Sequence, residues 1–195
     1  MPQPDHITAL DIEDRNNLDE RREKYIRILQ EKLGFVPNVI KAYSFDNAKL
    51  AAFADFFSDL MGGKSGLSSL EREMIAVVVS SINQCYYCLV SHGAEVRVLS
   101  GDPELGEMLA INYRVAELSP RHRSMLDFAV KLTKVAHKVE EADRQVLRDV
   151  GFSDVDIWDI SAVSSFFNMT NRMASAVGMI PNKEYHGLAR GAAMR

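Results

Sequence analysis

The six prolines of this 195-residue chain stand only at the edges of long apolar segments. Because proline breaks the interior of a helix and removes a hydrogen bond from a central strand, regular elements must run between these positions. Within the segments apolar residues recur at three- and four-residue spacing, and no stretch alternates as a half-buried strand does. The segment after Asp46 shows this spacing at Leu50, Phe53, Phe56, Phe57, Leu60 and Met61. We therefore predict an all-α fold.

Capping residues predict where nine helices begin and end. Asn17 precedes the first, Pro37 can open the second, and Asp46 can cap the third. Gly34 stands where the first helix would end. Six helices have predicted bounds at both ends, and they span residues 18–33, 85–99, 104–118, 120–137, 140–150 and 153–177.

The segment that follows Ser68 leaves a choice between helix and strand. Residues 74–82 include three consecutive valines, which suit a buried strand as well as a buried helix. Ser68 and Glu71 have the spacing of a capping box, and the segment is long for a strand. We predict a helix buried on most sides, ending at a break near Asn83-Gln84.

The length fits one helical domain, residues 1–195, in which an extension of about 34 residues precedes two halves. The first half, about 35–103, contains both cysteines, and the second covers about 104–186. Six identities relate the halves when the sequence is shifted by 85 residues: Ser68/Ser153, Ile75/Ile160, Val78/Val163, Ser80/Ser165, Asn83/Asn168 and Gly93/Gly178. Two buried helices share composition, so these identities leave both a duplication and chance similarity open.

The composition limits the partners and the compartment. A formal net charge of −4 provides no general basic surface for nucleic acid or anionic membranes. The residues after Met1 lack the basic flank and apolar stretch of a signal peptide, and the longest apolar run, residues 75–79, is far too short for a membrane span. We expect a cytoplasmic protein that binds neither nucleic acid nor membrane.

The only two cysteines, Cys85 and Cys88, form a C-x-x-C motif with His92 four residues further on. In a cytosolic chain such a pair indicates redox or metal chemistry. The first turn of a helix favours a thiolate, an imidazole on the same face can take its proton, and a second thiol can close a disulfide. The motif therefore supplies an attacking thiolate, a resolving thiol and a base.

Glu73 joins this group through the predicted hairpin. If the chain turns at Asn83-Gln84, residues at similar distances from the turn lie at the same level of two antiparallel helices. Glu73 then faces His92, where a carboxylate would orient the imidazole and raise its basicity. Because His92 is nearer in sequence to Cys88, we expect Cys88 to be the more activated thiol and Cys85 to resolve it. The position of Cys85 at the helix N-terminus argues for the opposite.

These residues resemble the signature of the AhpD-like, carboxymuconolactone decarboxylase superfamily of all-α proteins. That signature is a glutamate, eleven residues, C-x-x-C, three residues and a histidine, matched here by Glu73, Cys85, Cys88 and His92 within a run that begins at Leu67. Residues 167–172, with Gly178 and Pro181, resemble its longer peroxidase-related branch. The resemblance covers about residues 34–186.

The resemblance implies that hydroperoxides are reduced through a Cys85–Cys88 disulfide, with His92 assisting Cys88 and a proton relay reaching Glu73. One position departs from the AhpD peroxidase motif, which has a histidine immediately before its second cysteine. Tyr87 stands there, and a phenol does not act as a base at neutral pH. We expect slower peroxidase turnover or a different substrate. We also expect Tyr86 or Tyr87 to line the pocket or a subunit contact.

The predicted function is a thiol-dependent peroxidase for alkyl and other organic hydroperoxides, without a cofactor. The alternatives are a thiol–disulfide oxidoreductase, a redox sensor, and a zinc site formed by Cys85, Cys88 and His92 with Glu73 or another residue as the fourth ligand. The resemblance implies a homo-oligomer, trimer or hexamer, reduced by a dithiol or a lipoyl-bearing protein. Apolar helix faces also predict self-association, and their aromatic residues are Phe53, Phe56, Phe57, Phe166 and Phe167.

Overall fold

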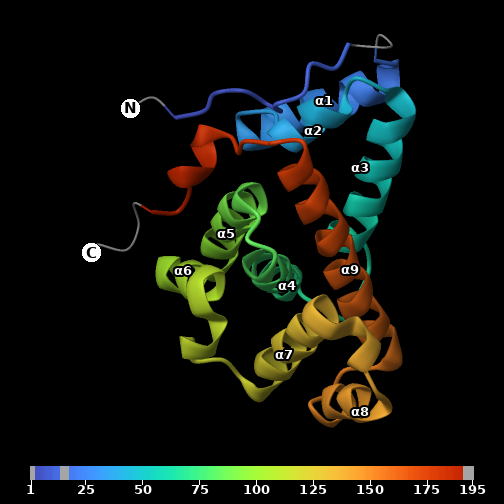
Figure 1. Cartoon of the computed structure of the whole chain (residues 1–195), viewed down its shortest axis with the longest axis vertical. Helices are drawn as coiled ribbons and strands as arrows, with labels where there is room; N and C mark the ends of the chain where they lie inside the picture. Colours follow the sequence, from blue (N-terminus) through green and yellow to red (C-terminus); the bar gives the residue numbers. More distant parts are fainter. Residues whose placement is uncertain (1–2, 14–17, 191–195) are drawn as a thin grey trace.

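The computed structural model describes residues 3–13 and 18–190, and every regular element within them is helical (Figure 1). The all-α prediction is confirmed. In chain order the α-helices are α1 (Glu20–Leu33), α2 (Asn38–Tyr43), α3 (Asn47–Gly62), α4 (Ser69–Ile82), α5 (Tyr86–Ser100), α6 (Pro103–Asn112), α7 (Pro120–Val135), α8 (Glu141–Asp149) and α9 (Asp154–Ala176). Short 3-10 turns are η1 (Tyr113–Val115), η2 (Ala136–Lys138) and η3 (Lys183–His186).

Helix α4 is the centre of the bundle because its sequence is apolar on nearly every side. Ten consecutive residues, from Glu71 to Ser80, are buried. Figure 1 shows α4 surrounded by α5, α6, α7 and α9, and it contacts all four. The predicted helix is therefore confirmed, and the alternative of a strand is excluded.

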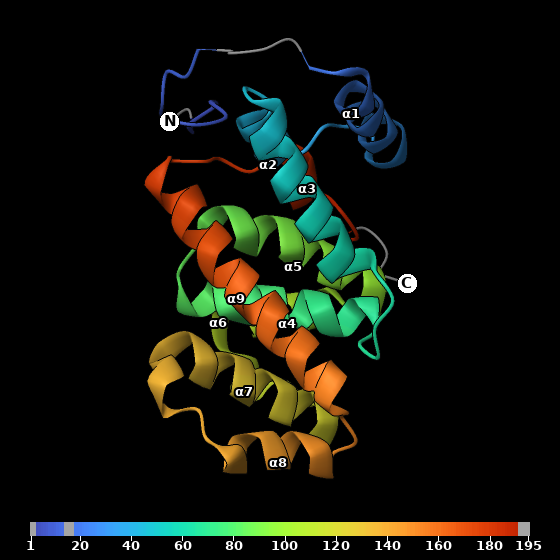
Figure 2. The ribbon, with the colours of Figure 1, turned by 90° about the vertical axis from the view of Figure 1, so that its right-hand side faces the viewer.

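A second layer covers α4 and α5 on one side. Figure 2 shows α3 and α9 running across these two helices, with α7 and α8 at one end of the molecule and α1 at the other. Aromatic side chains join the two crossing helices, since the ring centroids of Phe53 and Phe166 are 5.8 Å apart. This layer closes the side of the bundle on which the two cysteines lie.

The predicted caps explain most helix boundaries. Asp46 accepts a hydrogen bond from the Lys49 amide at the start of α3, and Gly34 ends α1 with a left-handed φ of 80°. Asn17 lies outside the described residues, and the observed cap of α1 is Asp19, so the helix begins two residues after the predicted Leu18.

The capping box of α4 permits a test of local stability. Ser68 Oγ accepts from the Glu71 amide at 3.1 Å, and Glu71 Oε2 accepts from the Ser68 amide at 2.8 Å. Ser68→Ala should lower the free energy of unfolding by about 1 kcal/mol because the Glu71 amide loses its acceptor. Urea unfolding measures this, with Ser69→Ala as the matched control. Equal losses in the two variants would contradict the role of the cap.

The predicted helix 104–118 ends too late. Helix α6 stops at Asn112, whose side chain accepts from the Arg114 amide and starts the turn η1. Arg123 then donates to the carbonyls of Tyr113 and Ala116 at 3.1 and 2.7 Å and fixes the non-helical path into α7. These hydrogen bonds from a side chain of α7 override the helical pattern of the segment. In the same way α7 gives way to the turn η2 at Ala136 rather than continuing to the predicted end at residue 137.

The proposed aromatic contact surface is largely internal. Phe53, Phe166 and Phe167 are buried in the core of the chain itself and are not available to a partner subunit, whereas self-association through the other apolar faces stays a prediction. Phe57 is half-buried and packs on the same core, and Phe56 is exposed. Among the described residues no helix combines the length and the apolar character that a membrane span requires.

Two positions matched in the possible duplication meet in space. The Asn83 side chain donates to Asn168 Oδ1 at 3.0 Å. Ser68 and Ser153, a second matched pair, each begin a helix with a capping box. The duplication itself stays a prediction.

Candidate active site

The turn between α4 and α5 places both cysteines at the start of a helix. Asn83 ends α4, and Gln84 has a left-handed φ of 52°, which is unfavourable for a residue with a side chain. The Cys85 amide then donates back to the Ser80 carbonyl at 3.0 Å. Cys85 becomes the N-cap residue of α5, and Cys88 lies in the first turn. The predicted break is confirmed.

His92 and Glu73 meet as the hairpin geometry predicts. His92 Nδ1 lies 2.7 Å from Glu73 Oε2, and both side chains are largely buried. A carboxylate at Nδ1 holds the proton on that nitrogen, which leaves Nε2 as the basic atom of the neutral ring. The ring also packs edge-on against Phe167, with centroids 4.6 Å apart.

The Glu73 carboxylate stabilises the protonated form of His92. Burial disfavours the imidazolium, but the charge of Glu73 and its hydrogen bond outweigh burial and raise the pKa of His92 above its usual range. The ring therefore keeps a proton to higher pH than an isolated histidine, as a group that donates and accepts protons near neutrality requires.

The two thiols differ in their surroundings although both are buried. A hydrogen bond from the Cys88 thiol, together with the Cys88 amide and Ser175, lowers the pKa of Cys85 to about 6 despite burial. The pKa of Cys88 is raised well above its usual value, because its proton is held by Cys85 and because the site is buried. In the resting pair the thiolate is therefore on Cys85 and the proton on Cys88.

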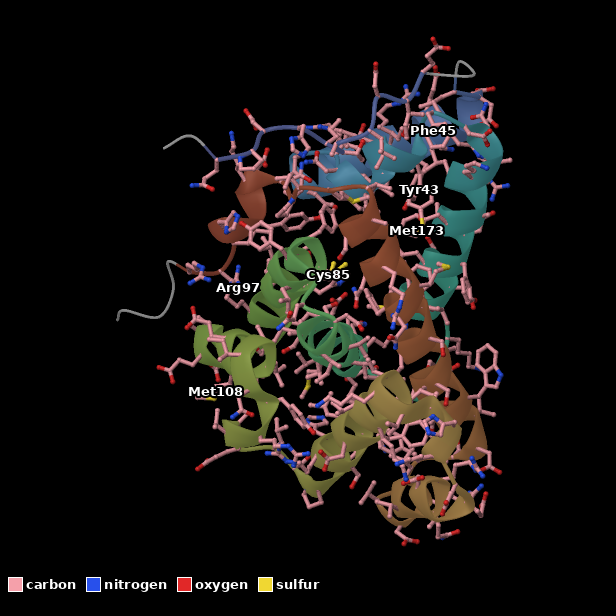
Figure 3. The ribbon with its side chains drawn as sticks, viewed as in Figure 1. Tyr43, Phe45, Cys85, Arg97, Met108 and Met173 are labelled. Atoms are coloured by element: carbon pink, nitrogen blue, oxygen red, sulfur yellow. The ribbon has the colours of Figure 1, made fainter. Side chains whose placement is uncertain are left out.

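Cys88, which we expect to be the more activated thiol, has the higher pKa of the two in this resting pair, and the assignment of the attacking sulfur stays a prediction. The largest cause is the Cys88 thiol, which donates to the Cys85 sulfur, and the Cys88 amide at the start of the helix lowers the pKa of Cys85 further. His92 does not offset this effect: its Nδ1 is held by Glu73, and in the described part of the chain no hydrogen bond joins the ring to either sulfur. Figure 3 shows Cys85 between α5 and α9.

This arrangement predicts the titration of the reduced protein. One thiolate should form with a midpoint near pH 6, and the second should form only at much higher pH. Cys88→Ala should move the first midpoint upward, because Cys85 loses the thiol that donates to it. Ultraviolet thiolate absorbance against pH measures both steps. Two thiols that titrate together at the ordinary thiol pKa would contradict the shared proton.

A cavity of about 420 Å³ opens beside Cys88 and is bounded by side chains of α1, α2, α3, α4, α5 and α9. Its walls are mostly apolar and aromatic, and they include Tyr43 and Met173, which Figure 3 shows on the side of α9 that faces α3. The ionisable and sulfur-bearing groups on the α4–α5 side are Glu73, Cys88, His92 and Glu95. Cys85 is not among the lining residues, so Cys88 is the sulfur that a bound molecule meets.

The two tyrosines of the motif lie in different surroundings, one buried and one exposed. Tyr87 is buried and lines the cavity, and its hydroxyl oxygen accepts from the Val39 amide at 2.9 Å. Burial raises the pKa of Tyr87 further, so this phenol is a structural anchor and not a base. Tyr86 is 56% exposed on the outside, with its hydroxyl 3.5 Å from His186 Nε2.

Sequence reasoning missed three polar residues near the thiols. Glu95 lines the cavity three residues after His92, and burial together with the Glu73 charge raises its pKa. Its spacing of three residues from His92 could have indicated that both side chains lie on one face of the helix. Ser80 and Asn171 lie against Cys88 from α4 and α9. Only the fold brings these two together, since they are far apart in the sequence.

The zinc alternative lacks a ligand cluster. Within the ranges that the structure describes, no group of three or more His, Cys, Asp or Glu side chains is arranged to hold a metal ion. Cys85, Cys88 and His92 therefore do not surround a common point, and Glu73 occupies Nδ1 of the imidazole.

Comparison with known proteins identifies the kind of protein that this helical fold and thiol site represent. Residues 48–111 match the model of the carboxymuconolactone decarboxylase family. A solved structure of an uncharacterized peroxidase-related protein from Silicibacter sp. TM1040 is 62% identical, with a TM-score of 0.93, and the match covers 97% of this chain and 100% of the other. A peroxidase-related protein with an alkylhydroperoxidase AhpD core, from Ralstonia eutropha JMP134, is 41% identical, with a TM-score of 0.91 and coverage of 96% and 98%.

The chain therefore belongs to the AhpD-like, carboxymuconolactone decarboxylase superfamily, as its sequence signature predicts. The debrominase Bmp8 has the same fold at 18% identity, with a TM-score of 0.74 and coverage of 94% of this chain and 95% of the other. A search of curated proteins gave no significant match.

Proposed function

We propose that this protein reduces organic hydroperoxides with Cys88 as the attacking sulfur and Cys85 as the resolving sulfur. The observation that carries the proposal is the position of Cys88. Cys88 lines an apolar cavity that Cys85 does not line, the two cysteines are hydrogen-bonded to each other, and the His92–Glu73 pair lines the same cavity.

The first step begins with a proton shift. The Cys88 thiol passes its proton to the Cys85 thiolate along their hydrogen bond, and the Cys88 sulfur attacks the terminal oxygen of the hydroperoxide. An S–O bond forms, the O–O bond breaks, and protonated His92 gives its proton to the departing alkoxide. The products are an alcohol, a sulfenic acid on Cys88 and neutral His92.

The second step closes the disulfide. Neutral His92 takes the proton of Cys85, and the Cys85 sulfur attacks the Cys88 sulfur. The S–S bond forms as the S–O bond breaks, and the departing hydroxide takes the proton from His92 to become water. Two electrons have then left the cysteine pair, and an external dithiol returns them by thiol–disulfide exchange.

The walls of the cavity support an organic substrate. A volume of about 420 Å³ lined mainly by apolar and aromatic side chains favours an alkyl or aryl group over hydrogen peroxide alone. Among the described residues that line the cavity there is no arginine or lysine.

Steady-state peroxide consumption tests this function. With excess dithiol we expect continuous consumption of an organic hydroperoxide, and loss of that activity after both cysteines are alkylated. A thiol–disulfide oxidoreductase would instead reduce a disulfide substrate without consuming hydroperoxide, and a sensor would be oxidised once without turnover. Either of these results would contradict the proposal.

We also propose that the protein self-associates. Exposed apolar side chains outside the cavity remain on α3 and α9, and they are Phe56, Val155, Trp158 and Met169. Sedimentation at micromolar concentration should show a species larger than the 21.9 kDa chain. A single 21.9 kDa species across the concentration range would refute this proposal.

A further inference from the structure

Two buried polar side chains that do not line the cavity lie beside Cys88. Ser80 comes from α4 and is 0% exposed, and Asn171 comes from α9 and is 1% exposed. Cys88 packs in one cluster with Ala174, which is one helical turn after Asn171 on the same face of α9. The crossing of α9 over the start of α5 thus brings Asn171 to the sulfur.

The orientation of the Asn171 amide is fixed by its neighbours. Its Oδ1 accepts from the Asn83 side chain at 3.0 Å, and its Nδ2 donates to Ser80 Oγ at 2.9 Å. Because the oxygen is bound to Asn83, the nitrogen must face Ser80 and Cys88. An amide nitrogen has two hydrogens, and the second donates to the Cys88 sulfur.

Ser80 has a matching role. Its Oγ already accepts from Asn171, so its own hydroxyl hydrogen is free to donate, and it donates to Cys88. The Ser80 carbonyl also accepts the Cys85 amide at 3.0 Å. One residue of α4 therefore fixes the backbone of Cys85 and donates to the sulfur of Cys88.

The proposed function requires a negative charge on Cys88 before attack. In the resting pair the negative charge is on Cys85, but only Cys88 meets the cavity. The charge must therefore move to Cys88 before attack, and a buried thiolate without donors would be costly. Two hydrogen bonds directed at an anion lower that cost, because hydrogen bonds to charged groups are stronger than neutral ones.

We propose that Ser80 and Asn171 are a pair of hydrogen-bond donors that stabilises the thiolate of Cys88. This stabilisation allows the proton to pass from Cys88 to Cys85 when substrate occupies the cavity. This inference rests on the proposed function, in which Cys88 attacks. It adds two residues outside the Glu–C-x-x-C–His signature, and it assigns Asn83 the role of orienting Asn171.

The test uses Cys85→Ala as a background, so that Cys88 is the sole thiol. Ser80→Ala removes one donor. Asn171→Asp keeps an oxygen for Asn83 but removes the amide donor. The matched control is Ser164→Ala, which deletes another fully buried serine hydroxyl, one that donates to the Ile160 carbonyl at 2.7 Å. The measurement is the rate of Cys88 alkylation by iodoacetamide against pH.

We expect the midpoint of the rate profile to move to higher pH by about one unit in Ser80→Ala, and by more in Asn171→Asp. Ser164→Ala should leave the midpoint in place. Unchanged midpoints in both test variants, or an equal shift in Ser164→Ala, would overturn the proposal. If Asn171→Asp does not fold, Ser80→Ala alone decides. Alkylation needs no hydroperoxide, so an enzyme without peroxidase activity but with the expected shifts would count against the proposed function only.

Discussion

Cys88→Ser will reduce the rate of organic hydroperoxide consumption by about three orders of magnitude or more, the size of loss that follows removal of an attacking nucleophile. The reason is position, since Cys88 lines the cavity and Cys85 does not. Cys85→Ser will behave differently, because it keeps the attacking sulfur. We expect this variant to consume one equivalent of hydroperoxide and then to stop at the sulfenic acid.

A sulfenate trap separates the two roles. After one equivalent of hydroperoxide, the trap should label Cys85→Ser and leave Cys88→Ser almost unlabelled. The opposite pattern would exchange the roles of the two cysteines, in keeping with the lower pKa of Cys85. No label in either variant would favour dithiol exchange over peroxidase chemistry. Serine preserves the size of each side chain, so both variants serve as structural controls for one another.

Glu73→Gln should slow turnover at neutral pH by about a hundredfold, within the range that general acid–base catalysis contributes. The amide retains the shape of the carboxylate but loses its charge, so the pKa of His92 falls back toward its burial-lowered value. The imidazole then holds less of the proton that the leaving alkoxide needs. The pH–rate profile should lose activity on its alkaline side first, since His92 deprotonates at lower pH in the variant.

Glu73→Gln should also change how the stability of the protein depends on pH. Because Glu73 raises the folded-state pKa of His92, the stabilisation from protonating this pair is complete below the ordinary imidazole pKa and is lost as pH rises through the raised value. The stability deficit of Glu73→Gln should therefore be largest in mildly acidic solution and smaller above neutrality.

Glu71→Gln is the matched control for Glu73→Gln. Glu71 is also buried on α4, but its carboxylate caps the helix and accepts from Arg121 Nε at 2.8 Å, and those hydrogen bonds lower its pKa against the effect of burial. We expect this variant to be less stable to urea but to keep the wild-type pH–rate profile. A rate for Glu73→Gln within twofold of wild type, or the same profile change in Glu71→Gln, would contradict the proton role of Glu73.

Local signals predicted the features of the fold that depend on neighbouring residues. The capping box at Ser68 and the break after Asn83 set the α4–α5 hairpin. Because Glu73 and His92 are at similar distances from the turn, the hairpin places them side by side. The end of α6 was not predictable in this way. It depends on Arg123 and on tertiary hydrogen bonds that carry no helical periodicity.

The site was predictable as a set of residues but not as a distribution of charge. The signature identified Cys85, Cys88, His92 and Glu73, whereas the location of the thiolate depends on the Cys88 thiol and amide, which both donate to the Cys85 sulfur. The donors Ser80 and Asn171 lie 91 positions apart and meet only because α9 packs across α4. For the same reason the sequence did not show that Cys88, rather than Cys85, opens onto the cavity.

A single-turnover experiment with the reduced wild-type protein tests the central claim most directly. Substoichiometric organic hydroperoxide is added without external reductant, and free thiols, alcohol product and the intact mass of the protein are measured. We predict two thiols lost and one alcohol formed for each hydroperoxide consumed, with a disulfide between Cys85 and Cys88. Unchanged thiols beside unconsumed hydroperoxide, or thiol loss without formation of the alcohol, would contradict a peroxidase built on this pair.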